Sequence, residues 1–225
     1  MQSFHDKAFI VEPIPDHMVI PAFGLMMNGD ELDLIHALRV AHESTSDDRL
    51  LAARPFTYCE VGIASGQTLS AMTDVLENLY PEDWRAFGVD IKNGWSLDLL
   101  ALWEKLKERE ECIEINLEGS EAFFREHVDA LDFVLLDGCH ECECVKIDFE
   151  GAAKRIPTGG IVAFHDSDEI AQGVHPQPHK GEPIGVRRAL FDLGLLPGGT
   201  KDWKLLADIE ANPGSHGVAI FQKRG

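Results

Sequence analysis

The chain has 225 residues, 44% of them apolar and 26% charged, which is enough for one large soluble domain with a sizeable core. Its formal net charge of −19 would repel phosphate backbones and anionic membranes, so we expect neither a nucleic-acid nor a membrane partner. The 5 cysteines do not resemble a secreted disulfide framework, and no signal peptide or membrane-spanning run is apparent, so the sequence predicts a cytoplasmic protein.

The first 54 residues differ in pattern from the rest of the chain. Residues 1–29 are punctuated by Pro and Gly, apolar spacing predicts a helix over 30–43, and residues 44–54 are expected to be a polar connection. We therefore expect residues 1–54 to be an N-terminal helical or irregular cap segment and residues 55–225 to be the main domain.

From residue 55 onward, the patterns of strands and helices alternate. The predicted strands cover residues 58–63, 86–89, 112–116, 131–136, 161–164, 203–209 and 217–222, and the predicted helices cover residues 68–79, 96–109, 121–128, 143–156 and 185–193. Such alternation predicts an α/β fold with a parallel sheet and right-handed crossovers. The last two strands are joined by a turn composition, so one of them must run antiparallel.

A glycine-rich loop follows the first predicted strand, in residues 60–68. Its spacing is G-x-x-x-G rather than the G-x-G-x-x-G of a dinucleotide site, and no lysine follows Gly66 as in a P-loop. Glu60 at the strand tip would repel a pyrophosphate and suits a ligand that carries an ammonium group. The alternative is an ordinary tight turn between a strand and a helix.

The next two strand tips carry residues that suit an adenosine. Asp90 can accept hydrogen bonds from both ribose hydroxyls, and Ile91 can pack on an adenine face, although an acid in a solvated loop is the alternative. Ser120 either hydrogen-bonds near the adenine or caps the following helix. With the glycine loop, these residues predict an adenosine-type ligand without a pyrophosphate, a description that S-adenosylmethionine fits.

Two apolar strands then end in acids and histidines. One is followed by Asp137 and His140, and the other by His165 and Asp166. Ligands of open α/β sheets bind at such tips, and carboxylates suit a hard cation such as Mg²⁺, whereas imidazole favours transition metals. A histidine with an ordinary pKa near 6.5 can also act as a general base, while the alternative for either histidine is a packing or surface role.

Two further segments are open to more than one interpretation. Cys139, Cys142 and Cys144 with His140 suggest zinc, but their spacing is tighter than the usual C-x₂-C pairs and no second ligand pair follows, which disfavours a structural zinc site. The loop over residues 175–181 could form a substrate wall or lid, or could be a Pro-rich loop without a ligand.

In residues 60–66, 87–90 and 131–166, the chain resembles class I S-adenosylmethionine-dependent methyltransferases, and most closely the macrocin, rhamnosyl and other natural-product O-methyltransferases. The resemblance covers roughly residues 55–225 and implies a Rossmann-like seven-stranded sheet, mostly parallel with an antiparallel last strand and helices on both faces. It also implies a cofactor that lies across the first two strand tips. The expected cofactor-binding residues are Glu60, Gly62, Ala64, Ser65, Gly66, Thr68, Asp90, Ile91, Gly119, Ser120 and Asp137.

Many relatives use a divalent cation, and the resemblance implies Asp137, His165 and Asp166 as its ligands, with His140 as a base. Mg²⁺ is the first expectation, with Mn²⁺ or Fe²⁺ as alternatives because of His165, which could instead act as a base or orient a ligand.

The expected function is S-adenosylmethionine-dependent O-methylation of a hydroxyl on a small molecule, assisted by this metal. Alternatives are a metal-dependent hydrolase or hydroxylase-like enzyme on the same fold, and a nucleotide-binding module without catalysis. The expected partners are a hydroxylated small-molecule substrate and a second copy of the chain, in a homodimer whose N-terminal segment serves as a lid.

Overall fold

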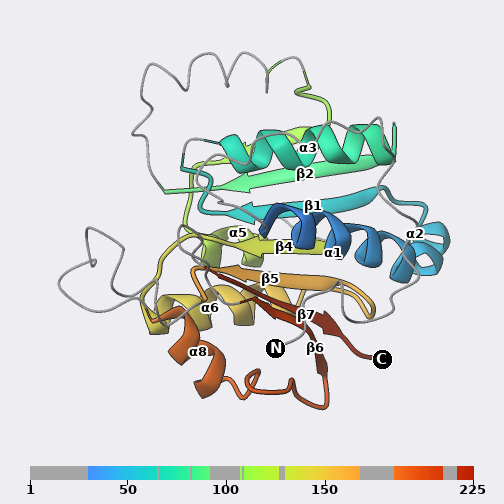
Figure 1. Ribbon diagram of the computed structural model, residues 1–225. Helices are drawn as coiled ribbons and strands as arrows, with labels where there is room; N and C mark the ends of the chain where they lie inside the picture. The colour runs from blue at the N-terminus through green and yellow to red at the C-terminus, as the bar shows by residue number, and fades with distance from the viewer. Residues whose placement is uncertain are drawn as a thin grey trace.

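The computed structural model describes residues 30–64, 66–81, 83–91, 107, 109–126, 130–167, 185–209 and 217–225. These residues form a seven-stranded sheet with helices on both of its faces (Figure 1). None of the helices within these ranges has the length and apolar character needed to cross a lipid bilayer.

The sheet has the strand order β3-β2-β1-β4-β5-β7-β6. In chain order, its strands are β1 (Phe56–Val61), β2 (Trp84–Val89), β3 (Ile113–Asn116), β4 (Phe133–Leu136), β5 (Ile161–His165), β6 (Trp203–Ile209) and β7 (Val218–Lys223). Strand β7 runs antiparallel to both of its neighbours, and the remaining pairs are parallel. The carboxyl ends of β1 to β5 therefore lie along one edge of the sheet (Figure 1).

The described helices are α1 (Asp30–Ser44), α2 (Ser46–Ala52), α3 (Gln67–Leu79), α5 (Ser120–Glu126), α6 (Cys142–Ala153) and α8 (Val186–Asp192). Side chains of α1 and α3 share one apolar core with the sheet, and side chains of α5, α6 and α8 share a second core with its other face. Strand β4 shows why its sequence is an unbroken apolar run: Phe133 and Leu135 point into the first core, while Val134 and Leu136 point into the second.

The structure confirms the predicted fold class, including the antiparallel last strand, with most element ends displaced by one to three residues. The main error lies in residues 44–54, which were expected to be a polar connection and instead contain α2. Its first turn carries Asp47 and Asp48, which favour a helix N-terminus, and the helix buries Arg49 while Leu50 and Leu51 stay exposed. Because its buried residue is an arginine, apolar periodicity gave no signal for it.

Some predictions fall outside the described residues. They are the segment 1–29, nearly all of the helix over 96–109, and the loop over 175–181. The domain boundary predicted at residue 54 stays a prediction, although Leu34, Ile35 and Leu38 of α1 belong to the same apolar core as the sheet.

Candidate active site

Backbone hydrogen bonds hold the predicted site segments against one another beyond the strand ends. The Gly62 amide donates to Val89 O at 2.8 Å, and the Asp137 amide donates to Val61 O at 2.8 Å. The Asp90 amide similarly donates to the Asn116 carbonyl at 3.0 Å. The three tips that follow β1, β2 and β4 are thus fixed side by side by the same ladder that builds the sheet.

The glycine loop requires glycine at two positions. Gly62 has φ +88°, and a Cβ there would lie 2.2 Å from the Asp137 carbonyl oxygen, so the loop and the β4 tip are in direct backbone contact. Gly66 has φ +73° and precedes α3, where its carbonyl accepts the Ser70 amide at 2.9 Å. Thr68 is buried in the first turn of α3, and Ser65 lies outside the described residues.

Asp90 connects the β2 tip to this loop. Its Oδ2 accepts a hydrogen bond from the Ala64 amide at 2.9 Å, and Ala64 has φ +40°, a region that residues other than glycine seldom occupy. Ile91, the next residue, is 74% exposed and so presents an apolar surface beside Asp90. This arrangement is compatible with the ribose and adenine roles predicted for the two residues.

Glu60 is far less accessible than a residue at a strand tip was expected to be. It is 1% exposed, and the Tyr58 hydroxyl donates a hydrogen bond to its Oε2 at 2.8 Å. Burial raises the pKa of Glu60 well above its usual value, and the nearby charge of Asp137 adds to this, while the Tyr58 hydroxyl acts in the opposite direction. A cationic group beside Glu60 would relieve this unfavourable burial of negative charge.

The region after β3 differs from its predicted helix start. The Gly119 carbonyl accepts the Phe123 amide at 3.1 Å, and α5 begins at Ser120, so Ser120 does not precede and cap the helix. The Ser120 hydroxyl instead donates a hydrogen bond to Asp148 of α6. Burial raises the pKa of Asp148, and the Ser120 hydroxyl partly offsets this effect. The bond fastens α5 to α6 next to exposed Gly119.

The four residues Asp137, His140, His165 and Asp166, here called the acid–histidine cluster, lie together at the tips of β4 and β5. His165 Nδ1 lies 3.0 Å from Asp137 Oδ1, and His140 Nε2 lies 2.8 Å from Asp166 Oδ2. The cross-contacts are longer, at 3.8 Å from His140 to Asp137 and 3.6 Å from His165 to Asp166. The two predicted clusters are therefore a single cluster.

The electrostatics of this cluster favour charged forms of all four side chains. Burial opposes the charge of His165, but the charge and hydrogen bond of Asp137, with those of Asp166, keep its pKa well above the usual value. Burial also opposes the charge of His140, whose hydrogen bonds to the two acids raise its pKa to about 9. The pKa of both acids is lowered by the histidines despite their burial.

A pKa of about 9 has a consequence for the base role predicted for His140. The imidazole is mostly protonated at neutral pH, so it can take up a proton only after its contacts with the acids change. The prediction assumed the ordinary histidine pKa, because nothing in the sequence says that Asp166 would lie 2.8 Å from this ring.

Asp166 is held in a strained backbone conformation, with φ +54°. Immediately after it, the Ser167 carbonyl accepts a hydrogen bond from Arg187 Nη1 at 3.2 Å. Arg187 also forms a two-point ion pair with Asp208 of β6, at 3.0 and 3.1 Å. Arg187 thus braces the β5 tip from α8, a role that sequence reasoning missed because both partners are distant in the chain.

The donor atoms of three cluster members suit a divalent cation. One ligand atom each from Asp137, His140 and Asp166 lies within 4.8 Å of the other two. Two carboxylates and one imidazole are ligands that Mn²⁺ and Fe²⁺ accept readily and that Mg²⁺ accepts in part. This group contains His140 in the place where the sequence predicted His165, and the metal role of His165 stays a prediction.

The cysteine-histidine set that suggested zinc is divided in the structure. His140 faces Asp166, and Cys142 Sγ lies 3.7 Å from Asp192 Oδ2 of α8. Cys139 and Cys144 are close to each other and to Glu141. All five cysteines are free thiols.

Comparison with known families assigns a function to the central part of the chain. Residues 59–167 match a family model described as a methyltransferase domain. The match covers nearly half of the chain and runs from β1 through the tip of β5, so it includes the glycine loop, Asp90 and the acid–histidine cluster. No match was found among proteins with curated descriptions.

Solved structures support the same fold. A protein from Corynebacterium glutamicum is 13% identical, with a TM-score of 0.60 over 89% of this chain and 84% of its own. The calicheamicin methyltransferase CalS11 is 14% identical, with a TM-score of 0.57 over 87% of this chain and 80% of its own. The O-methyltransferase TomG of Streptomyces achromogenes, solved with S-adenosylmethionine, is 18% identical, with a TM-score of 0.56 over 84% and 90%.

At these identities the structural likeness establishes the fold, and the family match adds the activity. With the glycine loop, Asp90 and the acid–histidine cluster on one edge of a sheet of this topology, the protein is an S-adenosylmethionine-dependent methyltransferase.

Proposed function

We propose that this enzyme transfers the methyl group of S-adenosylmethionine to a hydroxyl oxygen of a small molecule, with help from a divalent cation. The observation that carries the proposal is the convergence of Asp137, His140 and Asp166, whose ligand atoms lie within 4.8 Å of one another at the tips of β4 and β5. The glycine loop and Asp90, which suit the methyl donor, lie on the same edge of the sheet.

The cofactor would be held by groups whose chemistry matches its parts. Asp90 accepts from the ribose hydroxyls while its Oδ2 keeps the Ala64 amide in place. Glu60, buried and biased toward its neutral form, becomes favourable as an anion when the methionine ammonium lies beside it. Gly62 lets the loop lie in backbone contact with the β4 tip, and Gly66, with φ +73°, turns the chain into α3, so neither position would place a side chain between the loop and the cofactor.

The acceptor side needs a deprotonated and aligned oxygen, because the methyl donor is already activated. A cation held by Asp137, His140 and Asp166 would lower the pKa of a hydroxyl bound to it. His165, 3.0 Å from Asp137, orients that carboxylate through its ring N–H. The departing hydroxyl proton must reach a base. His140 could accept it only in its neutral form and only while it is not a ligand of the cation, because both roles use the lone pair of a ring nitrogen; otherwise the proton would pass to water.

Two neighbours suggest what kind of acceptor to test. CalS11 is described as a TDP-rhamnose 3'-O-methyltransferase in calicheamicin biosynthesis, and TomG as an O-methyltransferase in tomaymycin synthesis. A hydroxyl on a natural-product sugar or ring is therefore the first class to screen, in line with the macrocin and rhamnosyl group that the sequence resembles.

The test is a methyl-transfer assay with labelled S-adenosylmethionine and a panel of glycosylated and phenolic acceptors. We expect label in an O-methylated product, with activity removed by EDTA and restored by Mg²⁺ or Mn²⁺. Methyl transfer that is insensitive to EDTA would refute the role of the metal. Methyl transfer only to amines would refute a hydroxyl as the acceptor.

The alternatives of a hydrolase and of a non-catalytic binding module receive no support from the methyltransferase family match. The same assay distinguishes them, since a hydrolase would release a product without consuming S-adenosylmethionine.

A further inference from the structure

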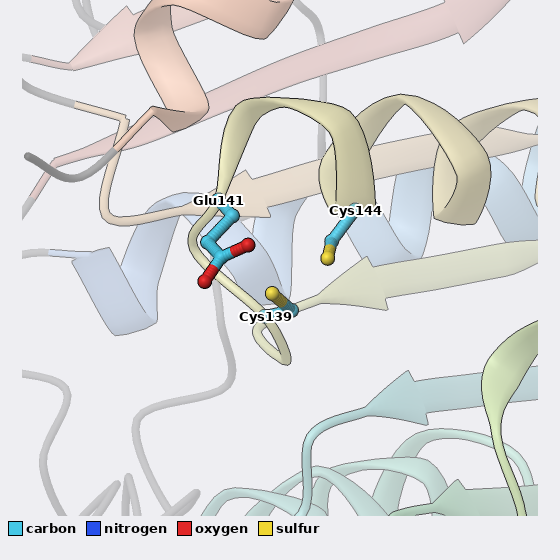
Figure 2. A group of neighbouring side chains, drawn as sticks. All are labelled: Cys139, Glu141 and Cys144. Carbon is cyan, nitrogen blue, oxygen red and sulfur yellow. The ribbon is translucent and has the colours of Figure 1, made fainter. Parts of the chain in front are cut away.

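A second group of metal-ligating side chains lies outside the machinery used above. It consists of Cys139, Glu141 and Cys144, here called the thiol–carboxylate group. Cys139 and Glu141 lie in the segment that joins β4 to α6, and Cys144 lies in the first turn of α6. Figure 2 shows the two sulfur atoms pointing toward each other, with the Glu141 carboxylate beside Cys139.

The spacing of these atoms suits a small thiophilic cation. The two Sγ atoms and a carboxylate oxygen of Glu141 all lie within 4.8 Å of one another. A tetrahedral zinc ion with Zn–S bonds of about 2.3 Å and a Zn–O bond of about 2.1 Å needs ligand atoms roughly 3.5–3.8 Å apart. Small side-chain rotations would therefore close the group around one ion.

The surroundings of the Glu141 carboxylate also favour cation binding. It is only partly exposed, and among the described residues its carboxylate has neither a hydrogen bond nor an ion pair, although the chain around it is rich in such pairs. Nearby Lys146 is bound by Glu143 and Asp192. The Glu141 carboxylate therefore has no cationic partner within the described part of the chain, and it lies beside two thiols. Together the three side chains supply three ligand atoms for a zinc ion.

Cys142 provides a contrast within the same turn of the chain. Its sulfur lies 3.7 Å from Asp192 Oδ2, on the side of α6 that faces α8, and it is not part of the group. The four-ligand set suggested by the sequence, with three cysteines and His140, is thus replaced by a three-ligand set in which an acid takes part.

We propose that the thiol–carboxylate group binds Zn²⁺ or a similar thiophilic divalent cation, with a fourth position open to water. On binding, each thiol exchanges its proton for a metal–sulfur bond, and both protons pass to the solvent. The ion would fix the segment between Asp137 and α6, which also carries His140. The proposal is independent of methyl transfer, because no thiol takes part in that reaction.

Co²⁺ is a suitable probe, since thiolate ligation gives it a near-ultraviolet charge-transfer band that carboxylate and imidazole ligands do not give. The full-length protein would be titrated without oxygen, in a phosphine reductant. We expect the band to appear and to be removed by Zn²⁺. C139S and C144S should abolish it, and E141Q should weaken Zn²⁺ binding more than about tenfold, since even outer-shell partners contribute that much.

C142S is the matched control and should bind Co²⁺ within about twofold of the wild type. D166N should keep the band, which separates this site from the acid–histidine cluster. A folded wild-type protein without the band, or a band that survives in C139S and C144S or is lost in C142S, would overturn the proposal.

A measurement on the wild type does not depend on the folding of any variant. Alkylation followed by mass spectrometry should show that Zn²⁺ protects Cys139 and Cys144 while Cys142 stays as reactive as before. Equal labelling of all three cysteines with and without Zn²⁺ would also overturn the proposal.

Discussion

Backbone strain is concentrated at single residues of the site. Of the described residues other than glycine, Ala53, Ala64 and Asp166 have positive φ, and two of these three belong to the loop and tip that would meet the ligands. Such conformations persist only where the surroundings impose them. The Asp90 carboxylate holds Ala64, and Arg187 holds the carbonyl that follows Asp166.

Gly62 allows a first prediction. In G62A the new Cβ would meet the Asp137 carbonyl at 2.2 Å in a backbone conformation that suits only glycine, so we expect the free energy of unfolding to fall by about 2 kcal/mol or more. The matched control is G198A, where nothing lies within 4 Å of the added Cβ and stability should change little. Urea denaturation measures the free energy of unfolding of both variants. Equal stability of G62A and G198A would show that the close approach of Gly62 to the Asp137 backbone does not require glycine.

Asp166 allows a second prediction, at the acid–histidine cluster. Asn keeps the size of Asp and tolerates positive φ, so D166N should fold. It removes the charge that both histidines face, and we expect the methyl-transfer rate to fall by about 100-fold or more, with S-adenosylhomocysteine affinity unchanged within about threefold. Steady-state kinetics and calorimetry on one preparation provide the check, and an undiminished rate would remove Asp166 from the mechanism.

The sequence predicted these residues because strands end where acids and histidines begin. It could not supply their partners. Glu60 was expected at an open tip, but Tyr58, two residues earlier on the same face of β1, covers it. Arg187 and Asp208 come together only because β6 and α8 are neighbours in space. Such contacts depend on tertiary geometry that no local pattern encodes.

Among the elements, α1 and α2 pack against Phe56, the first residue of β1, and against Tyr80, which follows α3. His42 of α1 stacks on Tyr80 with ring centroids 3.5 Å apart, and Arg49 of α2 lies over the Phe56 ring and donates to the His42 carbonyl. Burial lowers the pKa of His42 to about 4, and the charge of Arg49 acts in the same direction. The contacts among His42, Tyr80, Phe56 and Arg49, here called the His42 junction, therefore hold the His42 imidazole in its neutral form at neutral pH.

A third prediction concerns the pH dependence of that junction. In the unfolded chain His42 takes up a proton near its ordinary pKa of about 6.5, whereas the folded protein resists until about pH 4. The unfolded state binds the extra proton in this window, so the contribution of His42 is complete above about pH 6.5 and is lost as the pH falls toward 4.

Because the ring is only half buried, we expect the difference to be about 1–2 kcal/mol. H42F keeps an aromatic ring against Tyr80 and does not titrate. Its stability, from urea denaturation at several pH values, should fall less than that of the wild type between pH 6.5 and 4. If stability depended on pH in the same way in the wild type and in H42F, His42 would not be the group responsible.

A fourth prediction concerns the amino ends of β1 and β4. Asp132 is fully buried, accepts two hydrogen bonds from Arg54 at 2.7 and 3.0 Å, and also accepts the Thr57 amide at 2.9 Å. R54M would leave this carboxylate without its cation and should reduce stability by about 3–5 kcal/mol. R125M, which removes an exposed pair with Glu126, should change stability by less than about 1 kcal/mol. Similar losses of stability in R54M and R125M would contradict the expectation that the buried ion pair contributes more than the exposed one.

Element prediction succeeded where apolar periodicity was strong, as in α3, β4 and β5, whose residues face one core or both. It failed at α2, where a buried arginine and two exposed leucines invert the usual pattern. It also left Ser120 open between a helix cap and a hydrogen bond near the adenine, whereas its hydroxyl donates to Asp148, 28 residues away in α6. Local preference was in each case overridden by a tertiary contact.

At the scale of the whole molecule, the strand order explains why the site exists. Parallel pairing of β2, β1, β4 and β5 brings Asp90, the glycine loop, Asp137 and Asp166 to one edge, although they are spread over more than 100 residues of sequence. Strand β7 pairs antiparallel with β5, so its first residue, Val218, lies opposite His165 at this edge, and the sheet continues through β7 to β6.

The proposed activity depends on binding of S-adenosylmethionine at this edge of the sheet. Calorimetric titration of the folded protein with S-adenosylhomocysteine, at two temperatures, measures that binding. We expect one site per chain, and about 10- to 100-fold weaker binding in D90N, which keeps an acceptor for the Ala64 amide but loses the charged acceptor for the ribose. Folded protein that binds neither S-adenosylhomocysteine nor S-adenosylmethionine would show that this edge is not a cofactor site, and D90N that binds as tightly as the wild type would remove Asp90 from it.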